Sequence, residues 1–125
     1  MPSPFTLPVT VGAAAVRHAD DGDLILISGH INRCPDADLF RWHLLHITGG
    51  PRSSAVHCLG FLAGRPYITS PVQCYDAETD AVQTASGRVY SLLSQGDYGA
   101  IPQVLTHCLI YALVERGTVD GDLQS

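Results

Sequence analysis

The chain has 125 residues, of which 46% are apolar and 15% charged, and its formal net charge is −5. This length suits one compact domain over residues 1–125, and the apolar fraction is too high for a disordered chain. All seven basic residues are Arg and are scattered along the sequence, so no basic stripe is present that would bind a phosphate backbone. Direct nucleic-acid binding is therefore not expected, and the acidic balance instead suits a basic protein partner.

No segment of the sequence is expected to hold the chain in a membrane. No apolar run approaches the roughly 20 residues that span a bilayer, and the first residues lack the pattern of a signal peptide. We therefore expect a cytoplasmic protein without a membrane partner. In a reducing cytosol its four cysteines are expected to be free thiols that behave as small apolar residues.

The N-terminal part predicts an extended lead-in followed by a hairpin. Three prolines fall within residues 1–8, so this lead-in cannot be helical. Apolar runs at 9–16 and 23–33 flank the cluster Asp20-Asp21-Gly22, and Asp-Gly is a strong signal for a hairpin turn. We therefore expect these two runs to pair as antiparallel strands.

Residues 39–48 (LFRWHLLHIT) fit two structures. An acid in the preceding loop could cap a helix that Gly49-Gly50 would end. As a strand, the segment would place Phe40, Trp42 and Leu44 on one face. We favour the strand, because it leads into the run of strands that follows.

The stretch 55–93 organises the chain. Short apolar runs rich in β-branched and aromatic residues alternate there with clusters of turn residues, which predicts an antiparallel meander. The cluster 63–66 and Ser86-Gly87 predict tight turns, the second with a positive φ at Gly87. Ser70-Pro71 predicts an edge position or a bulge in the next strand.

Beyond residue 97 the apolar pattern indicates one long helix that begins near Pro102 and ends before Gly117. Its apolar residues extend beyond one stripe, so a loop or a second subunit should cover the outer side. The candidates for contacts in a homodimer are Ile110, Tyr111 and Val114. Residues 118–125 are expected to form a polar tail.

These elements together predict an α+β fold. It should contain an antiparallel, twisted or barrel-like sheet of five to seven short strands, with the one long C-terminal helix packed on it.

Six histidines and four cysteines raise the alternative of a small metal- or thiol-dependent enzyme, built on His57-Cys58 and His107-Cys108. Zinc sites bring ligands together through close pairs such as C-x2-C, and no His or Cys pair here has that form. A glycine-rich phosphate loop and a nucleophile elbow are also absent from the sequence. We therefore expect no metal, no cofactor and no catalytic residue, and keep the enzyme as a competing hypothesis.

Aromatic and Arg residues on or beside the predicted sheet are the candidates for a protein-binding surface, because Tyr, Trp and Arg dominate binding hot spots. The alternative is that aromatic residues such as Trp42 and Tyr67 belong to the sheet core. The candidate binding residues are Trp42, Arg65, Tyr67, Tyr75, Arg88 and Tyr90.

Residues 84–92 read T-x-S-G-x-x-Y-x-L, and Ile68-Thr69-Ser70-Pro71 and Asp76 precede them. This pattern, over about a fifth of the chain, resembles the hairpin of small uncharacterised phage- and plasmid-borne bacterial proteins. That family has no agreed activity or catalytic residues, so the resemblance implies only a bacterial or mobile-element origin.

Small size, acidic charge and the absence of a catalytic motif predict a non-enzymatic protein-binding module. Its concrete version is an acidic inhibitor of a host defence complex, of the anti-CRISPR kind. A self-assembling structural subunit is the third hypothesis.

Overall fold

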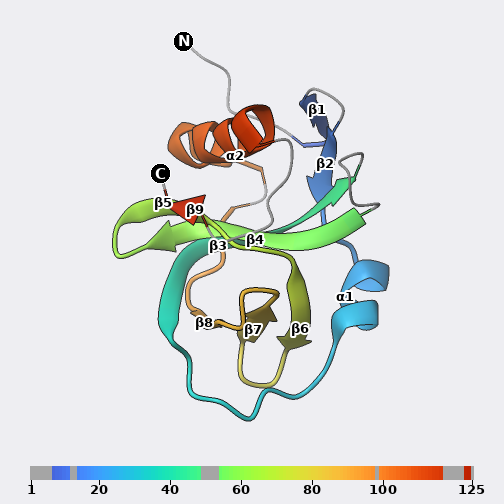
Figure 1. Ribbon diagram of the computed structural model, residues 1–125, viewed down its shortest axis with the longest axis vertical. Helices are drawn as coiled ribbons and strands as arrows, with labels where there is room; N and C mark the ends of the chain where they lie inside the picture. Colours follow the sequence, from blue (N-terminus) through green and yellow to red (C-terminus); the bar gives the residue numbers. More distant parts are fainter. Residues whose placement is uncertain (1–6, 12–13, 49–53, 98, 117–122, 125) are drawn as a thin grey trace.

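In the part of the chain that the computed structural model describes (residues 7–11, 14–48, 54–97, 99–116 and 123–124), nine strands form one sheet and two helices pack on it (Figure 1). The elements in chain order are β1 (Val9–Val11), β2 (Ala14–His18), α1 (Asp21–Ile27), β3 (Ala37–Thr48), β4 (Ser54–Leu62), β5 (Arg65–Ile68), β6 (Val72–Asp76), β7 (Ala81–Thr84), β8 (Val89–Leu92), α2 (Gln103–Arg116) and β9 (Leu123–Gln124).

The twelve-residue strand β3 is the centre of the sheet. One edge pairs with β4, and the other edge pairs first with β8, in parallel, and then with β2. The register of β3 with β4 shifts between Phe40 and His43, and Arg41 has a φ of 51°. This shift lies between the part of β3 that pairs with β8 and the part that pairs with β2. Such a bulge bends a strand, which lets β3 belong to both halves of a curled sheet.

The strand order is β6-β7-β8-β3-β4-β5-β9, and the β1–β2 hairpin joins at β3. In Figure 1, α2 lies on one side of β3, β4 and β5, whereas β6, β7, β8 and α1 lie on the other. The sheet therefore curls into a half-barrel below its central strands and carries α2 above them.

Each side of the central strands has its own core. The helix-side core, under α2, consists of Ala14, Val16, Leu45, Ile47, Leu59, Ile68, Ile101, Leu105, Cys108, Leu109, Ala112 and Leu113. The barrel-side core, inside the half-barrel, consists of Leu39, Trp42, Leu44, Val56, Cys58, Tyr67, Val72, Val82, Tyr90 and Leu92. Successive side chains of a strand point to opposite faces, so β3 and β4 contribute alternate residues to the two cores.

Several sequence predictions are confirmed. The fold is α+β, and the ambiguous segment 39–48 is a strand within β3. The turn at Ser86-Gly87 joins β7 to β8 with a φ of 89° at Gly87. The strand that follows Pro71 is β6, which ends the strand order and carries a register shift between Val72 and Cys74.

Several details of the predicted fold are wrong. The meander expected over residues 55–93 is interrupted, because β5 and β6 are not neighbours in the sheet. The sheet is mixed, because β3 and β8 run parallel, and it has nine strands instead of five to seven. The C-terminal helix has fourteen residues, which is an ordinary length and not a long helix. Leu123–Gln124, within the expected polar tail, pairs with β5.

The predicted hairpin of residues 9–16 with 23–33 is also wrong. Residues 9–16 contribute both strands of a hairpin, β1 and β2, and β2 pairs with the end of β3. Residues 21–27 form α1, because Asp20 and Asp23 make a capping box: each side chain accepts a hydrogen bond of 2.9 Å from the other's backbone N–H. These two hydrogen bonds satisfy backbone donors at the helix start. They favour a helix although Ile25 and Ile27, which are β-branched, favour a strand.

Candidate functional site

The Asp23 side chain connects α1 to the sheet. Its carboxylate accepts hydrogen bonds from the Arg17 guanidinium at 2.7 and 3.3 Å, and its Oδ1 lies 3.8 Å from Nε2 of His46. The Arg17 guanidinium and the backbone N–H of Asp20 hold the pKa of Asp23 down to about 2. Asp23 is therefore ionised near neutral pH, and it fixes the first turn of α1 beside the ends of β2 and β3.

The outer face of α1 is apolar and exposed. None of its seven residues, all of them described, is buried. The side chains of Ile25 and Leu26 are 71% and 86% exposed, whereas Leu24 and Ile27 pack partly against the barrel-side core. Because the two residues are adjacent, they form one exposed apolar patch, which is a candidate contact surface.

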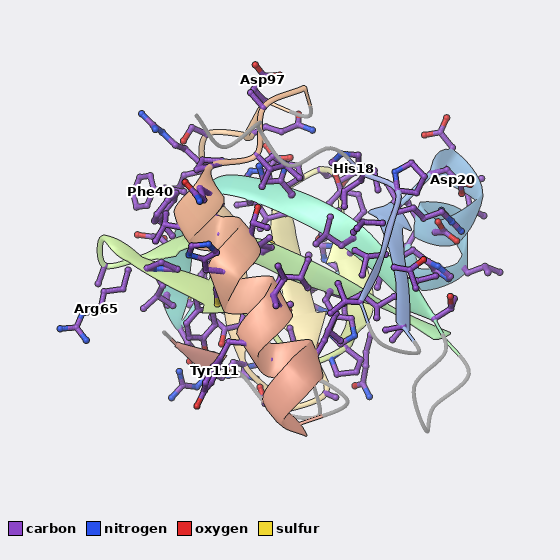
Figure 2. All side chains as sticks on the ribbon, turned by 90° about the horizontal axis from the view of Figure 1, so that it is seen from above. His18, Asp20, Phe40, Arg65, Asp97 and Tyr111 are labelled. Atoms are coloured by element: carbon purple, nitrogen blue, oxygen red, sulfur yellow. The ribbon has the colours of Figure 1, made fainter. Side chains whose placement is uncertain are left out.

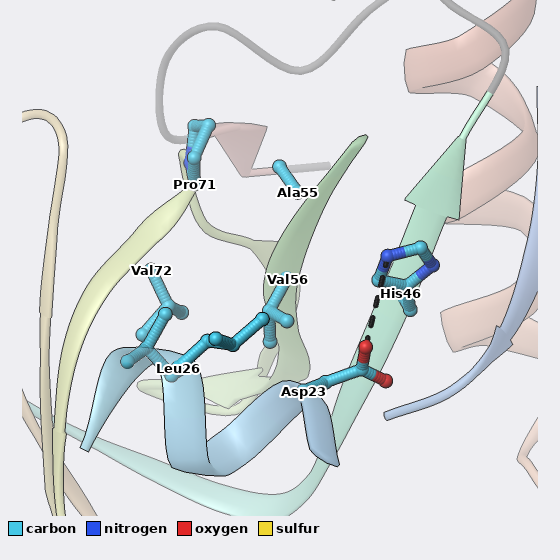
Figure 3. A pocket seen from close by; sticks show the side chains of 8 residues that line it. Asp23, Leu26, His46, Ala55, Val56, Pro71 and Val72 are labelled. Atoms are coloured by element: carbon cyan, nitrogen blue, oxygen red, sulfur yellow. Dashed lines mark ion pairs between the residues drawn. The ribbon is translucent and has the colours of Figure 1, made fainter. Parts of the chain in front are cut away.

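A cavity of about 250 Å³ lies between α1 and the open side of the half-barrel (Figure 3). β4 and β6 lie side by side there, but no strand pairing joins them in the described part of the chain. In Figure 3, Ala55 and Val56 of β4 face Pro71 and Val72 across this seam, and the Asp23–His46 ion pair lies at one end. The lining residues are Asp23, Leu26, Ile27, His46, Ala55, Val56, Pro71 and Val72.

Exposed acidic side chains lie at the start of α1 and in the turn that follows β6. Asp20 and Asp21 lie exposed at the start of α1, and Glu78 and Asp80 lie exposed in the turn after β6, against which α1 packs. Arg17 binds Asp23 and the carbonyl of His18, and its guanidinium also lies 3.5 Å from the carboxylate of Asp20. We call the combination of Ile25, Leu26, the four acids and the cavity the α1 face.

Three of the predicted binding residues belong to the barrel-side core and not to the surface. Trp42, Tyr67 and Tyr90 are at most 8% exposed. The Tyr67 and Tyr90 hydroxyls are 2.7 Å apart, and the Trp42 indole N–H donates to the carbonyl of Leu93 at 2.9 Å. These side chains occupy inward positions of the curled strands, where aromatic area is buried and the polar ends are hydrogen-bonded.

The other predicted binding residues do not form one patch. Arg65 is exposed at the start of β5, after the β4–β5 turn, and Arg88 is exposed in the turn between β7 and β8. Tyr75 is half-buried in β6 and packs partly against the barrel-side core. These three residues therefore lie on separate turns and strands, and not on the single binding surface that the sequence suggested.

The predicted dimer face is part of the outer side of α2. Tyr111 is 53% exposed and Ile110 is half-buried, while the side chain of Val114 lies outside the described residues. Val104, one heptad before Tyr111, is also exposed. Tyr111 points away from the helix in Figure 2.

The two cysteines of the enzyme hypothesis lie in different cores. Cys58 belongs to the barrel-side core and Cys108 to the helix-side core. Burial raises the pKa of both thiols, that of Cys108 to about 11, so neither is a thiolate nucleophile near neutral pH. His57 Nδ1 lies 2.9 Å from the carbonyl of Thr69, and no cluster of three potential metal ligands occurs among the described residues.

A smaller cavity of about 180 Å³ lies beside the loop before α2, where Gly96 packs against the ring of the buried His43. Burial, and to a smaller extent the neighbouring His18 ring with its centroid 6.0 Å away, lower the pKa of His43 to about 4. This histidine is therefore neutral near pH 7 and part of the packing.

Sequence reasoning missed Ile25 and Leu26, because it placed them in a strand. The signal that would have found them is Asp20-x-x-Asp23 before an apolar run, a pattern typical of a capped helix start. A helix of seven residues that begins there necessarily leaves part of the Leu24–Ile27 run in solvent.

Comparisons of the chain with protein-family models, with curated proteins and with solved structures found no match. Within the described residues, neither helix is long and apolar enough to cross a bilayer.

Proposed function

We propose that the protein is a non-enzymatic protein-binding module that uses its α1 face to bind a basic partner. The observation that carries this proposal is the exposure of Ile25 and Leu26, at 71% and 86%, beside a cavity. Burying two aliphatic side chains of this size contributes roughly 1.5–3 kcal/mol each when they become fully covered. That gain is available only to a partner, since the described chain leaves both side chains in solvent.

The charge around the pair selects the partner. Asp20 and Asp21 at the start of α1 and Glu78 and Asp80 in the turn after β6 are exposed acids, and the chain has a net charge of −5. Acidic groups around an apolar centre attract a partner with Arg or Lys around an apolar anchor, and they raise the association rate at low salt. We therefore expect the affinity to fall as salt rises.

The concrete version of this proposal is an acidic inhibitor of a host defence complex, of the anti-CRISPR kind, from a bacterium, phage or other mobile element. It is supported by the net charge and by the T-x-S-G-x-x-Y-x-L pattern at 84–92. Proteins of such complexes that hold nucleic acid carry basic surfaces, which are the complement of the α1 face.

The test is capture of a partner from a bacterial lysate at low and high salt by three tagged proteins: the wild type, Leu26→Ser and Tyr111→Ser. Both variants replace an exposed apolar side chain without a change in charge, but Tyr111 lies on α2, outside the α1 face. We expect one stoichiometric basic protein on the wild type and on Tyr111→Ser at low salt only, with at least about a tenfold loss for Leu26→Ser. Equal retention by all three proteins, or retention at high salt, would contradict the proposal.

A further inference from the structure

We infer that the partner is anchored in the α1 face by one lysine side chain, whose aliphatic stem fills the cavity and whose ammonium group binds Oδ1 of Asp23. This inference rests on the proposed function and specifies the residue by which the basic partner is recognised. A Lys side chain combines an apolar stem with a charged end, and the cavity has an apolar and an anionic part to match.

The walls of the cavity are apolar except at one end. Six of the eight lining residues are apolar. Among them Val56 and Val72 are buried, whereas Leu26 is exposed. In Figure 3 the two polar lining residues, Asp23 and His46, lie together at one end of the cavity. The cavity therefore suits a side chain that is aliphatic along its length and polar at its tip.

The Asp23 carboxylate has room for one more donor at Oδ1. Its Oδ2 accepts two short hydrogen bonds, from the Arg17 guanidinium at 2.7 Å and from the Asp20 N–H at 2.9 Å. Among the described residues, Oδ1 accepts one longer hydrogen bond, from Arg17 at 3.3 Å, and Nε2 of His46 is 3.8 Å away, beyond hydrogen-bond distance. Since a carboxylate oxygen can accept two hydrogen bonds, Oδ1 can accept another from a ligand.

The charges beside the cavity favour a cation, and the geometry favours Lys over Arg. The Arg17 guanidinium lies 3.5 Å from the carboxylate of Asp20 and 2.7 Å from that of Asp23, and Asp21 adds a third acid in the first turn of α1. A second guanidinium could not bind both oxygens of Asp23, because Arg17 already does. An ammonium group is a compact donor that needs one oxygen.

The anchoring side chain must come from a different protein. All seven basic residues of this chain are Arg, so no side chain of a second copy could supply the ammonium group. An aliphatic anchor such as Leu would fill the cavity but bring no donor to Asp23, and covering an ionised carboxylate without a donor costs free energy. A partner that presents Lys satisfies both parts of the cavity.

The experiment begins with selection of a peptide from a displayed random library of about twelve residues per peptide on the full-length protein. The enriched peptide should contain one essential Lys. Norleucine at that position keeps the stem without the charge, and diaminopropionic acid keeps a charge on a short stem; each should weaken binding at least about tenfold, and Arg at least about fivefold. In NMR spectra, the carboxylate carbon signal of Asp23 should shift more than those of Asp20 and Asp21 when the Lys peptide binds.

Two variants of the protein test whether the Lys enters the cavity. Ala55→Leu places a larger side chain on the cavity wall and should weaken the Lys peptide at least about tenfold. The matched control is Ala15→Leu, because Ala15 is exposed on β2 and does not line the cavity. This control should bind the peptide within about twofold of the wild type.

Failure to enrich a Lys peptide, undiminished binding of any of the three substituted peptides, or a larger shift at Asp20 or Asp21 than at Asp23 would overturn the lysine anchor. Equal binding by Ala55→Leu and Ala15→Leu would overturn it as well. If Leu26-dependent capture from the lysate persists in any of these cases, the proposed function stands without the anchor. If that capture is also lost, both proposals fall.

Discussion

The helix-side core and the barrel-side core share β3 and β4 but differ in how they are closed. The helix-side core is almost entirely aliphatic, and α2 covers it with five buried apolar side chains from Leu105 to Leu113. The barrel-side core contains Trp42, Tyr67 and Tyr90, whose polar ends are hydrogen-bonded, and α1 covers its seam with no buried residue. The two helices therefore close the sheet differently: α2 closes a core, whereas α1 leaves a cavity and an apolar surface beside it.

The largest effect is expected where α2 closes the helix-side core. Leu105 is fully buried there, so Leu105→Ala should lower the free energy of unfolding by about 2–5 kcal/mol through lost burial and a residual cavity. The adjacent Val104, which is 47% exposed, provides the matched control, and Val104→Ala should change it by less than about 1 kcal/mol. Urea denaturation of both variants measures their free energies of unfolding. Similar losses would contradict the burial of one face of α2 and the exposure of the other.

Acid should destabilise the packing around His43 on the same side of the sheet. Its pKa is lowered to about 4 in the folded protein, below the roughly 6.5 of an unfolded chain. The unfolded state therefore binds more protons between these values, so the free energy of unfolding should fall as pH falls from about 6.5 to 4. The free energy of unfolding, measured by denaturation at several pH values in this range, should depend less on pH for His43→Asn than for the wild type. This holds even if the variant is less stable at pH 7. An equal slope would assign the acid sensitivity to other groups.

In the barrel-side core, the hydroxyl contact of Tyr67 with Tyr90 should contribute a smaller amount. Tyr67→Phe and Tyr90→Phe each remove this 2.7 Å hydrogen bond and should cost about 0.5–1.5 kcal/mol. Since both variants remove the same bond, the double variant should lose less than the sum of the two. Additive losses in this double-mutant cycle would mean that the hydroxyls do not stabilise one another.

The smallest effect on stability is expected on α1. Leu26 is 86% exposed, so Leu26→Ser should change the free energy of unfolding by no more than about 0.5 kcal/mol. The same variant is expected to lose partner binding. A large loss of stability would place Leu26 in the core in solution and would remove the basis for the α1 face.

Much of the fold was predictable because it depends on local patterns. The alternation of short apolar runs with turn residues identified β4 to β8, and the glycine at Ser86-Gly87 identified a turn that needs positive φ. The continuous apolar pattern after Pro102 identified α2. In each case neighbouring residues carry the information, because the turns and the helix are formed by short-range contacts.

The candidate site was not predictable in the same way. The run Leu24–Ile27 is compatible with a strand, and only the contacts of Asp23 with Asp20, Arg17 and His46 hold it as a helix beside the seam. The burial of Trp42 depends on the bulge at Arg41, and that of Tyr90 depends on the parallel pairing of β8 with β3. The pairing of β8 with β3 joins residues about fifty positions apart in the chain.

The sequence by itself determined the fold class, the meander turns, the position of α2 and the acidic charge, because these follow from composition and from interactions between near neighbours. Only the tertiary structure decided which aromatic residues are buried, which aliphatic residues remain in solvent and where the sheet stays open. The physical reason is that exposure and strand edges depend on what packs against a residue from distant parts of the chain. Tyr90 shows this: its place in the T-x-S-G-x-x-Y-x-L pattern is visible in the sequence, but its burial appears only when β8 pairs with β3.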